Sequence, residues 1–174
     1  MKSIVMLSGP VGAGKTTVAR ELLAVSTGPT AYIEGDKFWF FIAKDGASRG
    51  MHKNFRMIMT AMVAAAVPYA LNEYEVILDF SVPPWFLGTA RKIAGRKEVP
   101  LDFVVLRPSE TVCAARAAAR VEGAIEDYAR YSELYASFDE AGSHILCDDE
   151  GSAASVAGRI REGLDRGVYR LEAS

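Results

Sequence analysis

"SGPVGAGKTT", from Ser8 to Thr17, is the stretch that decides the fold of this chain. Gly9 to Thr16 satisfies the pattern G-x-x-x-x-G-K-[ST], and it lies between a predicted strand and a predicted helix. Glycines let consecutive backbone N–H groups turn inward around an anion, and the positive end of the following helix points at the same place. The pattern predicts a site for a nucleoside triphosphate. The alternative is a glycine-rich turn that carries a solvated lysine.

Each part of this loop has an expected role. Lys15 is expected to bridge the outer phosphates as a point charge, and the Thr16 hydroxyl is expected to bind Mg²⁺. The expected cofactors are therefore ATP and Mg²⁺, although the loop does not distinguish ATP from GTP. The residues expected to hold the nucleotide are Gly9, Pro10, Val11, Gly12, Ala13, Gly14, Lys15, Thr16, Thr17 and, from a later helix, Arg116.

Composition limits the class of protein and its partners. The chain has 174 residues, of which 50% are hydrophobic and 24% charged, and this fits one globular domain over residues 1–174. The net charge of −2 gives no positive field that would hold a nucleic acid backbone, so a small-molecule partner is favoured. Cys113 and Cys147 show no metal-binding spacing, which favours reduced thiols in the cytoplasm.

The longest uncharged stretch, residues 57–72, raises the question of a membrane span. It falls short of the roughly 20 apolar residues that a span needs, and it contains Pro68. The N-terminus has only a short apolar segment before the glycines, unlike a signal peptide. We therefore expect a core helix, a cytoplasmic protein and no membrane partner.

Apolar runs and helical patterns alternate along the chain. Five strands separated by helices predict a three-layer α/β/α domain with a five-stranded, mainly parallel sheet. Residues 109–138 are expected to form a small helical lid. The strands are expected at residues 3–9, 30–36, 75–81, 101–108 and 143–149, and the helices at residues 14–25, 50–72, 109–122, 125–138 and 152–166.

Two acidic residues end predicted strands, where ligands bind in open α/β sheets. Asp36 ends "IEGD", and it is expected to accept the proton of a substrate hydroxyl and to orient that oxygen for attack. Asp79 ends "VILD", and it is expected to help hold Mg²⁺ through water. For both residues the alternative is a structural capping role.

Two arginines stand four positions apart in "RAAAR". On a helix of small residues, Arg116 and Arg120 would lie on one face with little else for them to engage. Arginines on a mobile segment can close over the charge that develops in phosphoryl transfer, so both are candidate catalytic residues. The alternative is a pair of solvated arginines that bind Glu110 or Glu122.

Taken in order, these motifs resemble the P-loop small-molecule kinases, a group that includes chloramphenicol phosphotransferase-like proteins, gluconate kinase and shikimate kinase. The resemblance covers about residues 1–122 and lies in "GPVGAGKTT", "EGD", "VILD", "VVLRPS" and "RAAAR". It implies a nucleoside-kinase-like P-loop fold, with Arg116 and Arg120 as lid arginines and Asp36 as the base. It also implies that "CDDEG", residues 147–151, borders the adenine.

The acceptor side departs from shikimate kinases, which carry a second acid and arginines for a carboxylate. Here "KFWFF" follows Asp36, so a polyhydroxy acid is not favoured. Aromatic residues can line a pocket for an aromatic or amphipathic acceptor, although some of the consecutive ones must be core. The candidates for acceptor contacts are Phe38, Trp39, Arg56 and Trp85, with Phe40, Phe41, Met51, His52, Phe55, Tyr128 and Tyr135 as further possibilities.

The sequence therefore predicts a kinase that transfers the γ-phosphoryl group of ATP to a hydroxyl of a small molecule, with Lys15, Asp36, Arg116 and Arg120 as the catalytic residues. A nucleoside or nucleotide kinase fits the aromatics equally well. An alternative of another class is a regulatory nucleotide-binding switch, although an NKxD motif is absent from the sequence. The identity of the acceptor and the oligomeric state stay open.

Overall fold

The computed structural model describes residues 2–44 and 50–172, and the side chains of residues 2–44 and 53–172. Five strands form one sheet in the order β2-β3-β1-β4-β5, and every pairing between neighbouring strands is parallel. This arrangement confirms the predicted parallel sheet. The strands are β1 (Ile4–Ser8), β2 (Thr30–Glu34), β3 (Glu75–Asp79), β4 (Leu101–Leu106) and β5 (Ile145–Leu146).

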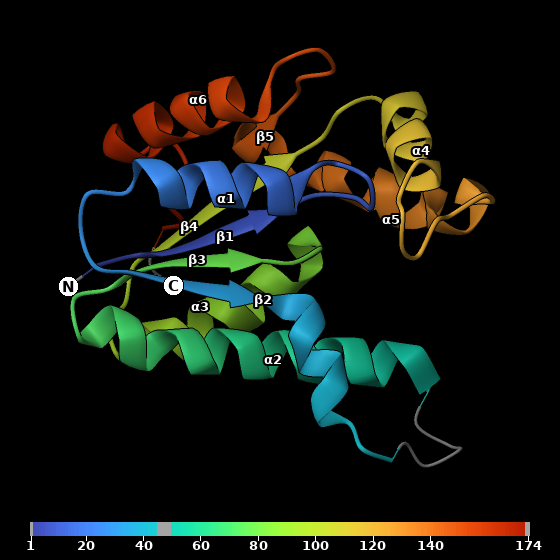
Figure 1. Ribbon diagram of the computed structural model, residues 1–174. Helices are drawn as coiled ribbons and strands as arrows, with labels where there is room; N and C mark the ends of the chain where they lie inside the picture. Colours follow the sequence, from blue (N-terminus) through green and yellow to red (C-terminus); the bar gives the residue numbers. More distant parts are fainter. Residues whose placement is uncertain (1, 45–49, 173–174) are drawn as a thin grey trace.

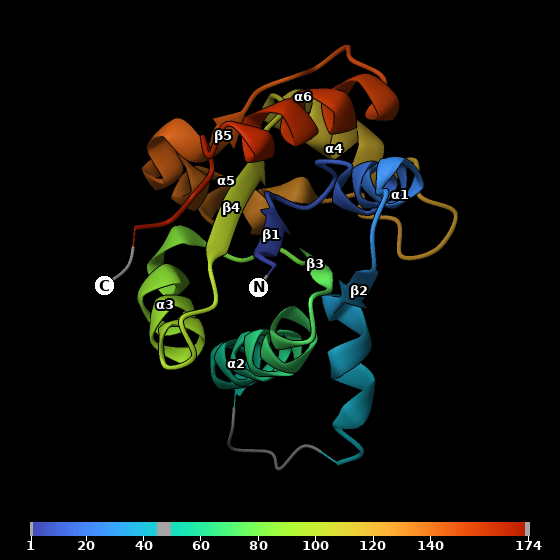
Figure 2. The ribbon, with the colours of Figure 1, turned by 90° about the vertical axis from the view of Figure 1, so that its left-hand side faces the viewer.

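Helices cover both faces of the sheet, as parallel strands require. Figure 2 shows α1 and α6 on one face and α2 and α3 on the other, while Figure 1 shows α4 and α5 beside the ends of the strands. The helices are α1 (Lys15–Val25), α2 (Gly50–Leu71), α3 (Leu87–Gly95), α4 (Glu110–Ala118), α5 (Ser132–Ser137) and α6 (Ala153–Asp165). Short 3₁₀ helices are η1 (Gly35–Phe41), η2 (Pro84–Phe86), η3 (Tyr128–Tyr131) and η4 (Phe138–His144).

Several elements differ from the sequence prediction. The strand expected at 143–149 is limited to β5 (Ile145–Leu146), because residues up to His144 belong to η4. Helix α3 was not predicted, although Ala90 and Ala94 lie four positions apart and are fully buried on one face. Helix α4 ends at Ala118 rather than at residue 122. The single helix expected at 125–138 is divided among η3, α5 and the start of η4.

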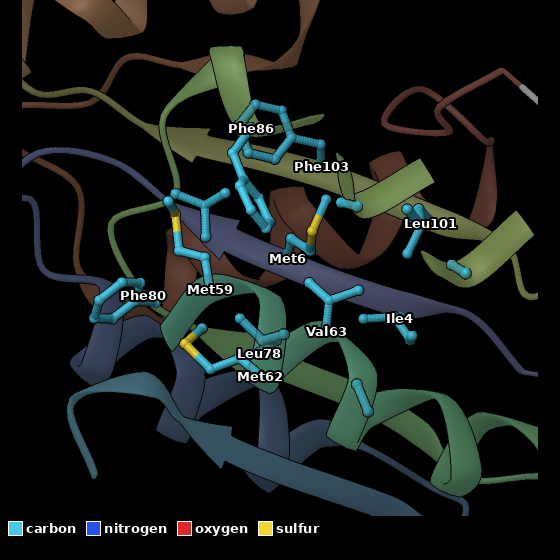
Figure 3. Close-up of a cluster of buried hydrophobic side chains, with 14 of the residues drawn as sticks. Ile4, Met6, Met59, Met62, Val63, Leu78, Phe80, Phe86, Leu101 and Phe103 are labelled. Atoms are coloured by element: carbon cyan, nitrogen blue, oxygen red, sulfur yellow. The ribbon is translucent and has the colours of Figure 1, made fainter. Parts of the chain in front are cut away.

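The larger core lies between the sheet and helices α2 and α3 (Figure 3). Every residue of β1 is buried, as expected for a central parallel strand. Residues 53–71 of α2 are long and apolar enough to cross a membrane by composition alone, but 44% of that window is buried inside the protein. The buried side chains follow helical spacing and pack on the sheet, so α2 is the predicted core helix: Ile58, Met59, Met62, Val63, Ala66 and Ala70.

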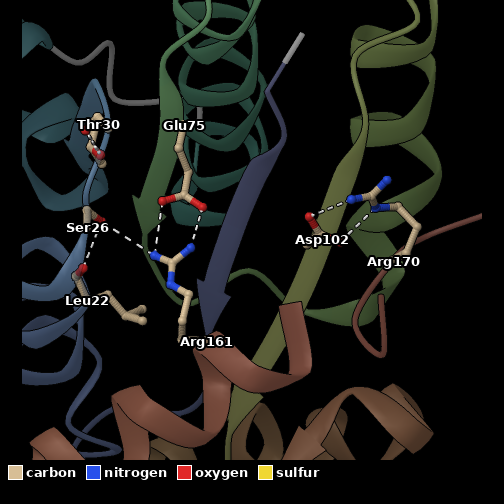
Figure 4. A network of polar contacts seen from close by, with 8 residues as sticks. Leu22, Ser26, Thr30, Glu75, Asp102, Arg161 and Arg170 are labelled. Carbon is tan, nitrogen blue, oxygen red and sulfur yellow. Dashed lines mark hydrogen bonds and ion pairs between the residues drawn. The ribbon is translucent and has the colours of Figure 1, made fainter. Parts of the chain in front are cut away.

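Ion pairs fasten the amino end of the sheet to the end of the chain (Figure 4). The Arg161 guanidinium of α6 donates to both carboxylate oxygens of Glu75 at 2.6 and 3.0 Å. The Arg170 guanidinium donates to Asp102 Oδ1 at 2.8 Å, and the Asp102 side chain is only 2% exposed. These contacts hold the last helix and the C-terminal segment against the amino ends of the strands. The carboxyl ends of the strands, at the opposite side of the sheet, are left for ligands.

Candidate functional site

The loop between β1 and α1 folds as a cradle that only glycine permits at two positions. Gly9 has φ of 138°, and a Cβ atom there would lie 2.1 Å from the carbonyl oxygen of Leu106. Gly12 has φ of 82°, and a Cβ atom there would lie 2.1 Å from the carbonyl oxygen of Cys113. L side chains rarely adopt such φ values, so both glycines are required by the backbone path. The loop leads into α1, whose N-terminal amides are a ready anion site.

Lys15 is folded back over this loop. Its ammonium donates to the carbonyl oxygens of Gly9 at 3.1 Å and Pro10 at 2.9 Å. Burial lowers the pKa of Lys15 to about 8, although the negative charges of Asp79 and Asp36 oppose that shift. The ammonium therefore lies within the electrostatic reach of both acids that the sequence singled out, and an arriving phosphate would favour its charged form.

Thr16 and Asp79 form the second polar group of the site. The Thr16 hydroxyl donates to Asp79 Oδ2 at 2.7 Å, and the Tyr32 hydroxyl donates to the same oxygen at 3.0 Å. The Asp79 residue is 4% exposed and ends β3, as predicted. Burial, followed by the charge of Asp79, raises the pKa of Tyr32, so this phenol stays protonated as a donor. The Asp79 carboxylate binds these two hydroxyls, which places it at the carboxyl edge of the sheet beside the loop.

The hydroxyl and carboxylate oxygens of Thr16 and Asp79 are the hard ligands that Mg²⁺ prefers, so this pair fits the expected cation. Among the described residues, no group of three His, Cys, Asp or Glu side chains is arranged to hold a metal. A cation at this pair would therefore depend on water and on nucleotide oxygens for its remaining ligands.

Asp36 does not end a strand, contrary to the sequence prediction. Strand β2 stops at Glu34, and Asp36 lies exposed in the first turn of η1, where the 3₁₀ turn begins at Gly35. Gly35 is required there, because a Cβ atom would lie 2.5 Å from the Phe80 ring. The N-cap of η1 is Glu34, so capping does not explain Asp36. Its carboxylate remains within the electrostatic reach of Lys15.

Arg116 and Arg120 do not share a helix face, because α4 ends at Ala118 and Arg120 lies beyond it. Arg116 Nη1 lies 4.0 Å from the position of a Cβ atom on Gly14, and Nη2 donates to the carbonyl oxygen of Asp149 at 3.2 Å. Arg120 is exposed, but its charge contributes to the lowered pKa of Lys15. Arg116 therefore lies beside the loop, whereas the influence of Arg120 on the site is through its charge.

One of the two acidic residues predicted as alternative partners of these arginines, Glu110, binds a serine instead. Glu110 accepts a hydrogen bond from the Ser132 hydroxyl at 2.5 Å, and this contact joins α4 to α5.

A cavity of about 240 Å³ adjoins the loop on the side of α6. It is lined by Ala13, Gly14 and Thr17 from the loop and α1, by Arg116, and by Leu146, Asp148 and Gly151. The last three lie in or beside the segment 147–151 that was expected to border the adenine, and Leu106, Val18 and Val156 add apolar walls. A larger cavity of about 420 Å³ lies at the amino edge of the sheet around Arg161, far from the loop.

Two tyrosines predicted as acceptor contacts instead bind the protein's own backbone. The Tyr128 hydroxyl donates to the carbonyl oxygen of Val11 at 2.7 Å, and the Tyr135 hydroxyl donates to that of Pro108 at 2.9 Å. The first contact ties η3 directly to the phosphate-binding loop. Both hydroxyls therefore donate to the protein's own backbone and support the site structurally.

The predicted acceptor aromatics divide into core and surface. Phe38, Trp39 and Phe55 are half-buried against the larger core, whereas Phe40 and Phe41 are 79% and 77% exposed. Trp85 is 47% exposed, and the Arg56 guanidinium carbon lies 5.0 Å from the centre of one of its rings. The side chains of Met51 and His52, also named above, lie outside the described residues.

Tyr32 is the site residue that sequence reasoning missed. It lies in the strand "TAYIE", where a half-buried tyrosine reads as an ordinary strand residue. Its register partner is Ile77, two positions before Asp79, so only the parallel pairing of β2 with β3 brings it near that carboxylate. No short motif in the sequence carries this information.

Comparison with known proteins identifies a family for this chain. A family model described as AAA domain matches residues 4–133, which is more than half of the chain. No curated protein matches the chain at a significant level.

Solved structures share the whole fold at low sequence identity. The APS kinase CysC of Mycobacterium tuberculosis in complex with AMPPNP and APS has 19% identity and a TM-score of 0.73, over 94% of this chain and 98% of that chain. The tunicamycin resistance protein of Deinococcus radiodurans has 17% identity and a TM-score of 0.70, over 99% of both chains. The shikimate kinase of Acinetobacter baumannii in complex with shikimate has 18% identity and a TM-score of 0.67, over 96% of this chain and 95% of that chain.

These matches confirm the predicted P-loop fold. The family model covers the phosphate-binding loop, both acidic residues and both arginines. The chain therefore belongs to the AAA domain family of P-loop proteins.

Proposed function

We propose that the chain is an ATP-dependent kinase that transfers the γ-phosphoryl group to a hydroxyl of a small molecule. The observation that carries the proposal is the geometry of the loop, where the Lys15 ammonium donates to the carbonyl oxygens of Gly9 and Pro10 and the adjacent Thr16 hydroxyl donates to Asp79. A candidate phosphate site and a candidate cation site are therefore adjacent, and the charge of Asp36, the candidate base, acts on the same ammonium. Phosphoryl transfer needs this arrangement, because its catalysis consists mainly of positioning and electrostatic stabilisation.

The nucleotide would bind along the loop from the cavity to Lys15. Amides at the start of α1 and the ammonium of Lys15 would hold the phosphates, and Arg116 would close over them from α4. The nucleobase would occupy the cavity of about 240 Å³. Asp148, which lines this cavity, accepts hydrogen bonds from Arg159 at 2.6 Å and from the amide of Gly151.

Thr16 and Asp79 would hold Mg²⁺ together with the nucleotide and water. The ion would supply charge neutralisation between the outer phosphates when bound. Lys15 would add a second positive charge on the same side. Arg120 would contribute to the charge that spreads over the equatorial oxygens during transfer.

Asp36 would activate the acceptor. Its carboxylate is exposed, so an incoming hydroxyl can approach it, and it lies within the electrostatic reach of Lys15. The acceptor oxygen would form a bond to the γ-phosphorus while the bond from that phosphorus to the bridging oxygen breaks, and ADP would leave. The hydroxyl proton would pass to Asp36.

The acceptor would approach over η1 and η2, whose exposed aromatics flank this side of the site. Phe40, Phe41 and Trp85 present apolar surface, and Arg56 beside Trp85 presents a positive charge. The fold neighbours named for APS, shikimate and tunicamycin resistance support a small organic acceptor. We propose no narrower acceptor on this ground.

Phosphorus NMR of ATP, Mg²⁺ and the protein across a panel of sugars, nucleosides and antibiotics tests the proposal. We expect one class of acceptor to give ADP together with a new phosphate monoester resonance. Asp36→Asn should lower that turnover at least tenfold with nucleotide affinity retained, because general base catalysis is typically worth on the order of a hundredfold or more. Glu140→Gln, which removes an exposed carboxylate from η4, is the matched control and should leave the rate unchanged.

Two results would contradict the proposal. Equal turnover in Asp36→Asn would remove the assignment of the base. ADP release that is independent of every acceptor and gives only inorganic phosphate would instead favour a nucleotide-hydrolysing switch.

A further inference from the structure

Tyr32 places an additional hydroxyl on the buried acid of the site. Asp79 Oδ2 accepts two hydrogen bonds, from Thr16 at 2.7 Å and from Tyr32 at 3.0 Å. The motif explains the first contact, because a threonine that follows the lysine of the loop is expected beside the acid of a neighbouring strand. Nothing in the motif requires the second contact, which comes from the middle of β2.

The pairing of β2 with β3 explains how Tyr32 reaches that carboxylate. Ala31 and Ile33 pack against the core beneath the sheet, whereas Tyr32 packs against the core on the side of α1. Tyr32 is level with Ile77 in the register, so its ring extends toward the carboxyl edge to reach Asp79. Only a long side chain with a terminal donor spans this distance, and phenylalanine would keep the ring without the donor.

The consequence concerns the orientation of the carboxylate. An aspartate side chain rotates broadly about its second torsion angle, and a single donor leaves much of that freedom. The Lys15 ammonium lies within electrostatic reach and attracts the same carboxylate. Two donors on one oxygen hold the carboxylate against that attraction. The Thr16 hydroxyl directs its proton to Asp79 and so keeps its lone pairs available.

We propose that Tyr32 is a positioning residue for the divalent cation: it fixes Asp79 in the orientation in which Thr16 and Asp79 together accept the cation of a metal nucleotide. The inference rests on the proposed function only in requiring that this site binds a metal nucleotide. Partners that orient metal ligands from outside typically change metal affinity by about 10- to 100-fold when they are removed.

Calorimetry with the non-hydrolysable analogue AMPPNP tests the inference without any turnover. Its affinity is measured in EDTA and in saturating Mg²⁺, and the ratio of the two affinities is the contribution of the metal. Tyr32→Phe should reduce this ratio about tenfold and change the affinity in EDTA by less than about twofold. Tyr74→Phe is the matched control, because Tyr74 is 41% exposed and contacts the Tyr69 ring away from the site.

A second background tests whether Tyr32 acts through Asp79. In the Asp79→Asn background, the additional substitution Tyr32→Phe should alter the ratio of affinities by less than about twofold. The effects of two substitutions in one hydrogen-bond network are not additive, so the second has little left to remove. Binding of Mn²⁺ to the nucleotide complex, followed by electron paramagnetic resonance, should show the same pattern. The stoichiometry in EDTA reports the folded fraction, so a partly unfolded variant does not distort the ratio.

The outcomes are distinguishable. An unchanged ratio in Tyr32→Phe, an equal loss of affinity with and without Mg²⁺, or the same loss in both backgrounds would overturn the role of Tyr32 and leave the proposed function standing. If wild-type protein bound AMPPNP in neither condition, both the proposed function and this inference would be wrong.

Discussion

The lowered pKa of Lys15 makes nucleotide binding depend on pH. Burial lowers this pKa to about 8 in the nucleotide-free protein, despite the nearby charges of Asp79 and Asp36. Phosphates beside the ammonium would raise the pKa again in the complex. At pH 8 the free protein therefore holds fewer protons on Lys15 than the complex does, so binding takes up a proton and weakens as the pH rises.

The magnitude follows from the charged fraction of Lys15. With a pKa of about 8, roughly three quarters of the side chains are charged at pH 7.5 and roughly one tenth at pH 9. If only the charged form binds well, the affinity for ATP should fall about eightfold over this interval. At pH 8, about half a proton should be taken up for each ATP that binds.

Calorimetry in buffers of different ionisation enthalpy measures both quantities. The affinity gives the pH profile, and the slope of the observed enthalpy against the ionisation enthalpy gives the proton uptake. Lys15→Met should bind weakly at every pH and lose the dependence, whereas Lys97→Met, an exposed lysine beyond α3, should keep it. A wild-type affinity that is constant from pH 7.5 to 9, with no proton uptake at pH 8, would refute this reasoning.

Three further predictions concern the frame of the site. Gly12→Ala should abolish ATP binding and lower the melting temperature, because its Cβ atom would lie 2.1 Å from a carbonyl oxygen of α4. Gly28→Ala, with open space around the new Cβ atom, is the control. Normal ATP binding by Gly12→Ala would contradict the backbone path described for the loop. Arg170→Met should lower the free energy of unfolding by about 1–2 kcal/mol, since it leaves the buried Asp102 without its half-exposed partner. Urea denaturation measures this loss. An unchanged midpoint of unfolding would show that the ion pair does not stabilise the fold. Tyr128→Phe should lower the free energy of unfolding by about 1 kcal/mol and weaken ATP binding several-fold, because it removes the hydrogen bond that ties the loop to η3. Wild-type affinity for ATP in a fluorescence titration would show that this hydrogen bond contributes to stability alone and not to binding.

The sequence predicts those parts of the fold that local patterns encode. The phosphate-binding loop is specified by glycines whose positive φ angles no other residue adopts easily, and the strand before it is a continuous apolar run. Asp79 was found because a parallel sheet brings the carboxyl ends of its strands to one edge. These inferences need only spacing and the rules of parallel sheets.

Other features depend on tertiary packing and could not be read in this way. Helix α3 is short and contains glycine, and it is stabilised by burying Ala90 and Ala94 against α2. Arg120 leaves the helix because the backbone turns after Ala118, before the positive φ of Gly123. The contact of Tyr32 with Asp79 requires the register between two strands that are more than forty residues apart in sequence.

The direct test of the central claim is an NMR titration of the backbone amides with AMPPNP and Mg²⁺. The account predicts that the largest chemical shift changes fall on the loop and the first turn of α1, at Gly12, Gly14, Lys15 and Thr16, and that Lys15→Met reduces them. Shift changes confined to the amino edge of the sheet, or none in folded protein, would contradict the claim that this loop binds the phosphates of a nucleotide.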